Sequence, residues 1–249
     1  MAEMEEDQAR ALRAVELLAM YGVYGHFYDL SWQRSLFRCR SLLELVARDR
    51  LPERREDLLQ CRPDLLVVMM NPGSSRPLVA GYVPPLIADR VPSLADYRFV
   101  ATRPDTTQYQ IMRVLAARGW GHARVLNLSD LREPKSPLLF QKMAAMVQGD
   151  LPAASHSIFF PQRRRELLSL IGPSATIPVI AGWGRHPILL PLAEQALDAL
   201  RGRRLIGVPA AGERRLYAHP SPMLQRQKEA WLENVLRQLD DLSAARPVV

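Results

Sequence analysis

Three polar side chains, Asn71, Asn127 and His219, have the chemistry and the spacing expected of a ligand site. Asn71 directly follows the apolar run 65–70, Asn127 lies in the mostly apolar segment 123–128, and His219 begins the sequence His-Pro-Ser-Pro. An amide side chain offers a hydrogen-bond donor and an acceptor, and so does a neutral imidazole. These groups can bind a polar ligand. Alternatively, the asparagines cap their own loops by bonding to the backbone, and His219 is satisfied within its loop.

The run 65–70 predicts the strand that organises the fold. It is apolar on both faces, which is typical of a strand in the middle of a parallel sheet. Pro72 fixes its backbone angle, Gly73 permits positive φ, and Ser74 and Ser75 add hydroxyl and backbone N–H groups. Ligands of open α/β sheets bind outside the carboxyl ends of strands, where this turn lies. An ordinary tight turn has the same composition.

Strand-like and helix-like segments alternate after residue 62. This alternation predicts an α/β fold with a doubly wound, mainly parallel sheet flanked by helices. Because the carboxyl ends of parallel strands gather at one edge, we expect Asn71, Asn127 and His219 to surround one cleft. The further expected strands are 178–184 and 205–209, and the expected helices are 108–118, 138–149, 162–171, 187–201 and 223–242.

The N-terminal part has a different pattern. Residues 4–20 and 31–48 show helical spacing of apolar residues, and the aromatic and glycine residues of 21–28 are expected to form a packed connector. We therefore expect residues 1–62 to be a helical extension packed on a main domain of residues 63–242. The Pro-rich stretch 76–105 is too long for a plain connector and predicts a functional loop or lid.

Composition excludes several classes of protein. The 249 residues contain two cysteines, which argues against a disulfide framework and against a cysteine-ligated metal centre. The four histidines other than His219 have no metal-ligand spacing. We expect no metal and no cofactor. The chain has neither an apolar run of membrane-spanning length nor a signal-peptide pattern. These features predict a cytoplasmic protein without membrane contact, and we expect a monomer.

The charge is strongly basic. The formal net charge is +7 and the sequence pI is about 9.8, and only three of the 33 basic residues are lysines. Arginine forks pair well with phosphate oxygens, so a polyanion such as DNA is an expected partner, although a GC-rich genome gives the same composition. Arginines cluster at 163–165, at 201, 203 and 204, and at 214–215.

Four motifs together resemble the uracil-DNA glycosylase superfamily. Met70-Asn-Pro-Gly73 resembles the first motif of its mismatch-specific branch, and Val125-Leu-Asn127 resembles the strand whose asparagine reads the pyrimidine. Ile180-Ala-Gly-Trp-Gly184 and His219-Pro-Ser-Pro222 resemble the later motifs. Their order and rough spacing agree from about residue 64 to 237, and four motifs in order are more specific than any one.

The chain is most similar to a bacterial group of unknown function within that superfamily, which shares a segment like Asp105-Thr-Thr107. It departs from the uracil-excising branch at Asn71, where that branch has an aspartate, and at Gly73, where it has a tyrosine. An amide cannot act as a strong base. The first 60 residues lie outside the resemblance.

The resemblance implies a role for each motif residue. Asn71 would position the attacking water, His219 would stabilise the departing base as a neutral donor, and Asn127 would read the base edge. Phe99 would stack on the flipped base or serve only as packing, and Trp183 is expected in the core. Gly73 would leave the pocket without a steric barrier. The implied DNA-contacting residues are Ser74, Ser75 and Ser221 for phosphates and Met223 or Leu224 as a wedge.

Three functions remain open at this point. The first is a DNA glycosylase that hydrolyses the N-glycosidic bond of a deaminated or damaged base. The second is a non-catalytic module on the same fold that binds nucleic acid or a nucleotide. The third is hydrolysis of a small nucleoside-like metabolite. The arginine clusters favour a polymer over a small metabolite.

Overall fold

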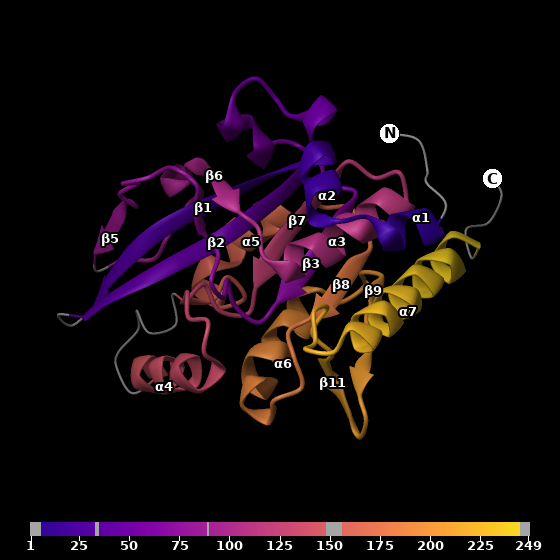
Figure 1. Cartoon of the computed structure of the whole chain (residues 1–249). Helices are drawn as coiled ribbons and strands as arrows, with labels where there is room; N and C mark the ends of the chain where they lie inside the picture. Colours follow the sequence, from indigo (N-terminus) through magenta and orange to yellow (C-terminus); the bar gives the residue numbers. More distant parts are fainter. Residues whose placement is uncertain (1–5, 33–34, 89, 148–155, 245–249) are drawn as a thin grey trace.

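A computed structural model describes residues 6–32, 35–88, 90–147 and 156–244. At its centre, four parallel strands lie in the order β7 (His122–Asn127), β3 (Leu65–Met69), β8 (Val179–Gly182) and β9 (Leu205–Ile206) (Figure 1). Every residue of β3 is buried, as its uninterrupted apolar run predicts. The expectation of an α/β fold with helices flanking a sheet is confirmed, but the sheet is mixed rather than mainly parallel throughout.

The other half of the sheet is mostly antiparallel and was not expected. A long hairpin of β1 (Tyr21–Trp32) and β2 (Ser35–Ala47) adds to the sheet, with β2 running antiparallel to β7. The helix predicted for 31–48 and the connector predicted for 21–28 are therefore wrong. Residues 39–47 are buried throughout, so the strand lacks polar and apolar alternation, and its leucines matched helical spacing by chance.

The Pro-rich stretch 76–105 also joins the sheet. It forms the short strands β4 (Arg76–Pro77) and β5 (Leu86–Ala88), then β6 (Phe99–Arg103). Both β5 and β6 pair with β1, and β4 pairs with β6, which gives a nine-stranded mixed sheet. Residues 1–62 therefore contribute strands to the same sheet as the predicted main domain. The short helix η3 (Leu94–Asp96) lies between β5 and β6.

Helices cover both faces of the sheet (Figure 1). On one face, α1 (Glu6–Ala11), α2 (Ala14–Met20), α3 (Thr106–Ala117) and α7 (Gln225–Ala244) pack with Leu65 and Val67 of β3. On the other, α4 (Ser136–Val147), α5 (Arg164–Ile171) and α6 (Leu190–Ala199) pack with Leu66 and Val68. The remaining elements are η1 (Arg48–Arg50), η2 (Arg55–Leu59), η5 (Pro161–Arg163), η6 (Pro187–Leu189) and the hairpin of β10 (Pro209–Ala210) and β11 (Glu213–Tyr217).

Candidate functional site

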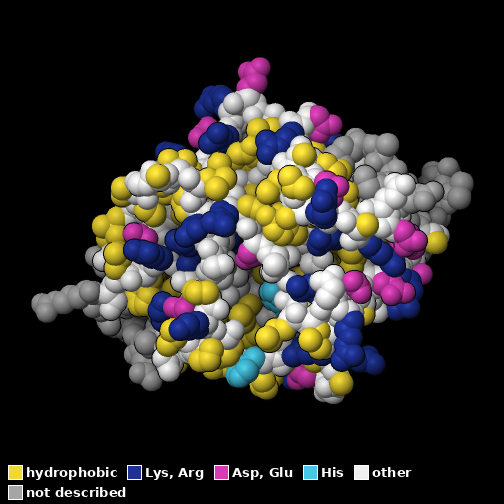
Figure 2. Space-filling model, in the orientation of Figure 1, with side chains coloured by type: hydrophobic (Ala, Val, Ile, Leu, Met, Phe, Trp, Pro, Cys, Tyr) yellow, Lys and Arg dark blue, Asp and Glu magenta, His cyan; other side chains and the backbone are white. Residues whose placement is uncertain are grey.

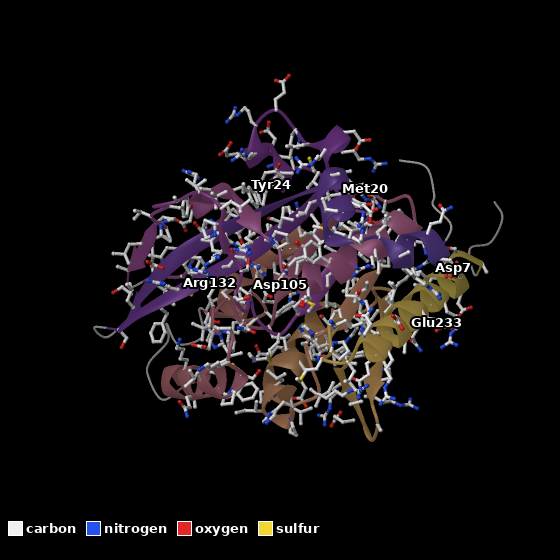
Figure 3. All side chains as sticks on the ribbon, viewed as in Figure 1. Asp7, Met20, Tyr24, Asp105, Arg132 and Glu233 are labelled. Atoms are coloured by element: carbon white, nitrogen blue, oxygen red, sulfur yellow. The ribbon has the colours of Figure 1, made fainter. Side chains whose placement is uncertain are left out.

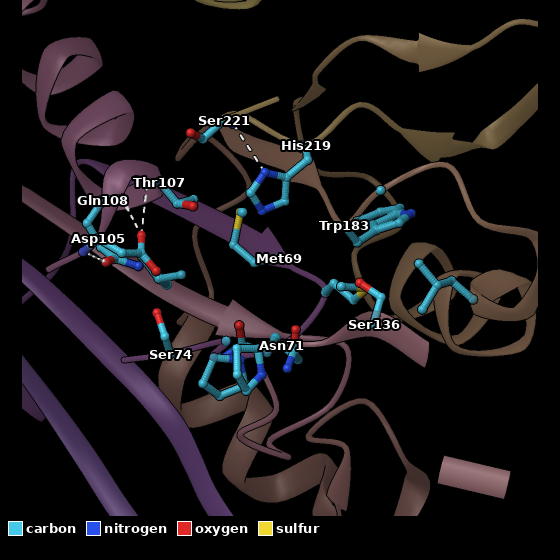
Figure 4. A pocket seen from close by; sticks show the side chains of 18 of the residues that line it. Met69, Asn71, Ser74, Asp105, Thr107, Gln108, Ser136, Trp183, His219 and Ser221 are labelled. Carbon is cyan, nitrogen blue, oxygen red and sulfur yellow. Dashed lines mark hydrogen bonds between the residues drawn. The ribbon is translucent and has the colours of Figure 1, made fainter. Parts of the chain in front are cut away.

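A cleft of about 700 Å³ opens at the carboxyl ends of β3, β7 and β8. Figure 2 shows it as a hollow near the centre of one face, with Lys and Arg side chains around it. Asn71, Asn127 and His219 all line this cleft, so the expectation that they meet is confirmed. Figure 4 shows the His219 ring projecting into the cavity beside Thr107, with Asn71 and Ser74 on the opposite wall.

Asn71 is held in one orientation by the loop after β7. Its Nδ2 donates to the carbonyl oxygens of Leu131, at 3.0 Å, and Glu133, at 2.8 Å. Both amide hydrogens are thereby used, and Oδ1 is left as the atom that can accept a bond from a ligand or water. The side chain of Asn71 bonds to backbone groups and so ties the loop after β3 to the loop after β7. It also presents an acceptor to the cleft.

Asn127 is the most unusual side chain in the cleft. It is 0% exposed, and neither Oδ1 nor Nδ2 has a hydrogen-bond partner within the described part of the chain. A buried polar group left unpaired costs about 1–3 kcal/mol, so proteins rarely keep one without a reason. The loop-capping alternative does not apply to this residue, because its amide bonds to no backbone group. The amide is arranged to bind something that enters the cleft.

His219 is prepared as a neutral hydrogen-bond donor. Its Nδ1 accepts the backbone N–H of Ser221 at 3.1 Å, so in the neutral ring the proton lies on Nε2. Burial lowers the pKa of His219, which keeps the ring neutral near pH 7, although the Ser221 bond and the charge of Asp105 oppose this shift. The loop is anchored to α3, because Ser221 Oγ bonds to Thr106 Oγ1 at 3.0 Å.

Asp105, labelled near the centre of the molecule in Figure 3, is a carboxylate in the cleft (Figure 4) whose role the sequence did not reveal. Its Oδ1 accepts the N–H groups of Thr107, at 2.8 Å, and Gln108, at 3.4 Å, and so caps α3. A helix that begins at 108, as the sequence predicts, would have its cap at Thr106 or Thr107, so the observed helix begins earlier. Gln108 Oε1 in turn accepts the backbone N–H of Asp105, and this Asp-x-x-Gln spacing is the signal that could have identified the cap.

Arg40 is a second lining residue that the sequence analysis missed. It is 1% exposed, and its Nε and Nη1 atoms have no partner among the described residues. In the pairing of β1 with β2, Ser41 is an extra residue between Arg40 and Leu42 that has no partner on β1, and it forms a bulge. Because of this extra residue, the side chain of Arg40 points away from the direction that regular alternation along the strand would give it. It thereby lines the cleft. A segment predicted as helix gave no sign of this.

Three predicted site residues do not line the cleft. Phe99 is 6% exposed and packs edge-on against Tyr97 in the core, which matches the packing alternative. Ser75 is 1% exposed, and its carbonyl oxygen accepts a bond from Arg132. Leu224 is exposed beside the cleft. Two other aromatic side chains do line the cleft, Phe140 of α4 and Trp183.

The other predicted site residues are part of the cleft wall. Gly73, Ser74, Ser221 and Met223 all line the cleft. Gly73 has φ +59°, and a Cβ atom there would meet no group of the described chain within 4 Å, so a side chain would project into open space. Met223 is 98% exposed at the edge of the cleft, which is unusual for a large apolar side chain. Trp183 is fully buried, as expected, and also contributes to the cleft wall.

The arginine clusters are mostly occupied within the chain. Arg163 is buried between Asp130 and Glu166, at 2.5 and 2.6 Å, so it cannot contact a polyanion. Arg201 pairs with Asp198 in the turn before β9, at the amino end of the parallel strands and opposite the cleft. Arg215 pairs with Glu213 and Glu194. The clusters thus give little support to a polyanion surface.

A different pair of arginines lies near the cleft. Arg76 and Arg103 are directly opposite one another across β4 and β6, and both side chains are exposed. Neither forms an ion pair with a described residue. Arg76 follows the 71–75 turn, and Arg103 lies two residues before Asp105, so both flank loops of the cleft. Like charges placed opposite one another destabilise a strand pair, and a bound anion would relieve the repulsion.

The described residues show neither a metal-binding cluster nor a membrane-spanning helix. Within the described residues, no three His, Cys, Asp or Glu side chains are grouped to hold a metal ion. None of the described helices is long and apolar enough to cross a membrane.

Comparison with protein-family models, curated proteins and solved structures gives no match. The function of the protein must therefore be inferred from the geometry of the cleft and from the motif residues that line it.

Proposed function

We propose that the protein is a DNA glycosylase that hydrolyses the N-glycosidic bond of a deaminated or damaged base. The observation that carries the proposal is the buried, unpartnered amide of Asn127 in the same cleft as the neutral donor His219. A flipped base presents a polar edge that an amide can read and, on leaving, develops negative charge that a donor can stabilise. Asn127 and His219 supply these two functions.

The water needs its own groups. Asn71 Oδ1 is a fixed acceptor in the cleft, because both hydrogens of its amide bond to the loop at 131 and 133. It can orient a water molecule but cannot remove its proton. Asp105 has one oxygen in the helix cap and a second that takes no part in the cap. Its negative charge would stabilise an oxocarbenium-like sugar, and its second oxygen can accept the proton of the water.

DNA is supported over a small metabolite by the rim of the cleft. Arg76 and Arg103 offer two exposed guanidinium groups next to cleft loops. Met223 offers an exposed apolar side chain that can enter the space vacated by a flipped base. Free nucleosides would use neither feature. These groups are consistent with a double-stranded substrate that is gripped outside the cleft.

The test is a cleavage assay on oligonucleotides that carry uracil, hypoxanthine, xanthine or an alkylated base, with free nucleosides in parallel. We expect abasic product from at least one oligonucleotide and none from the nucleosides. Asp105→Asn is expected to reduce cleavage at least about 100-fold while retaining DNA binding. Binding without cleavage of any base would instead support the binding module, and cleavage of nucleosides alone would support the metabolite hydrolase.

A further inference from the structure

The buried guanidinium of Arg40 is not paired with any of the described residues. Its Nε and Nη1 atoms lack partners, and it forms no ion pair with any described residue. Asp105 and Asp130, the two carboxylates whose charges act on Arg40, form neither a hydrogen bond nor an ion pair with it. Asp130 bonds to Arg163 and to the hydroxyl of Tyr28, at 2.5 and 2.8 Å, and Asp105 caps α3. Burial of an unpaired charge is unfavourable, and so a ligand group is the missing partner.

The position of Arg40 limits what this ligand group can be. The side chain is 1% exposed and lines the deep cleft together with Asn127. A phosphate of the DNA backbone stays at the surface and cannot reach a group buried to this extent. Only a part of the ligand that enters the cleft, such as a flipped base, can contact it. A guanidinium has donors and no acceptor, so the contacted atom must be an acceptor.

Asn127 cannot make this choice by itself. Its amide presents a donor on one side and an acceptor on the other, and no described group bonds to either atom. Because no described residue fixes which way the amide is turned, Asn127 can rotate to match an amino edge as well as a carbonyl edge. Discrimination between these edges needs a group that can only donate, and Arg40 is such a group.

We propose that Arg40 is the residue that selects bases with a carbonyl oxygen at the ring position where cytosine and adenine carry their amino group, and that Asn127 binds the adjacent edge without selecting. The inference rests on the proposed function, since it takes a base as the ligand. It assigns the substrate class as oxo bases, the products of deamination, and excludes cytosine and adenine because their amino hydrogens would face the donors of Arg40.

Binding of free bases tests this without any requirement for cleavage. Isothermal titration with the matched pairs uracil against cytosine and hypoxanthine against adenine measures the preference directly. We expect the wild type to bind the oxo member at least about 10-fold more tightly, since a group placed to hydrogen-bond one ligand atom rejects analogues that leave it unpaired. In Arg40→Met and Arg40→Gln the ratio is expected to fall to about 1 to 2. Arg40→Lys, which keeps a donor, is expected to retain part of the preference.

The control is Asn127→Ala, which is expected to weaken both members of each pair to a similar extent. Arg40→Gln keeps polarity and similar size, so it serves if Arg40→Met does not fold. An unchanged ratio in a folded Arg40→Gln, or no binding of any free base by the wild type, would overturn the inference. An Arg40-dependent preference without cleavage of any oligonucleotide would support it while refuting the glycosylase function.

Discussion

Asp105 and His219 line the same cleft from elements more than 100 residues apart, and the charge of Asp105 raises the pKa of His219 against the larger lowering caused by burial. The relationship links the helix cap of α3 to the ionisation of the proposed base-stabilising donor. Asparagine keeps the cap without the charge, whereas alanine removes both. We therefore expect Asp105→Asn to lower the pKa of His219 further, as measured by NMR titration of its ring. A His219 pKa that is unchanged in Asp105→Asn would contradict this link. Asp105→Ala, but not Asp105→Asn, is expected to lower the free energy of unfolding by about 1 kcal/mol.

The two cleft asparagines are expected to behave in opposite ways when truncated. Asn71→Ala removes two hydrogen bonds to the loop at 131 and 133, so the free energy of unfolding should fall by about 1–3 kcal/mol. Asn127→Ala removes two unpaired buried atoms and should leave stability unchanged or raise it. Urea denaturation measures both. A loss of stability in Asn127→Ala as large as that in Asn71→Ala would show that Asn127 has a structural partner after all.

Stability should decline in mild acid because of buried histidines. Burial lowers the pKa of His26 and of His156 to about 4 in the folded protein. When folding lowers the pKa of a histidine, its contribution to stability is complete at pH values above the pKa of the unfolded state, near 6.5. This contribution is lost as the pH falls towards 4. Each histidine should contribute about 3 kcal/mol to this loss. Denaturation curves at several pH values measure the slope. His26→Asn keeps an acceptor for the backbone N–H of Arg98 and should make the decline shallower; equal slopes would count against His26.

Because Gly73 has no side chain, the pocket should accept bases that carry an additional substituent. Its backbone is in the left-handed region, and a Cβ atom would point into open space in the cleft. If the protein excises bases, we expect poor discrimination between uracil and thymine opposite guanine. Gly73→Tyr should restore rejection of thymine, and Gly73→Ala controls for the backbone strain. Strong rejection of thymine by the wild type, unaltered in Gly73→Tyr, would show that Gly73 is not near the 5-position of the base.

Arg76 and Arg103 should account for part of the salt dependence of DNA binding. Each phosphate contact adds about one to the slope of log affinity against log salt concentration. Arg76→Ala and Arg103→Ala are each expected to reduce that slope by about one. Arg201→Ala, on the opposite edge of the sheet and already paired with Asp198, should not change it. Fluorescence anisotropy with a duplex and a single strand measures the slope, and an equal effect of all three variants would indicate nonspecific charge alone.

The sequence by itself determined the parallel core and the three polar residues around the cleft. The run 65–70 has no polar face, and turns rich in glycine, proline or asparagine follow the strands, so both the buried sheet and the position of Asn71 and Asn127 at its carboxyl edge are consequences of local pattern. His219 joins them because its loop precedes the last helix and bonds to α3.

Only the tertiary structure decided the rest of the site. Residues 39–47 are buried on both faces, so nothing local separates a strand from a helix, and long-range pairing with β1 and β7 made the choice. The bulge that directs Arg40 into the cleft is a property of that pairing. In the same way, only the folded chain shows that Arg163 is neutralised by Asp130 and Glu166, whereas the amide of Asn127 has no partner in the part of the chain that the structure describes.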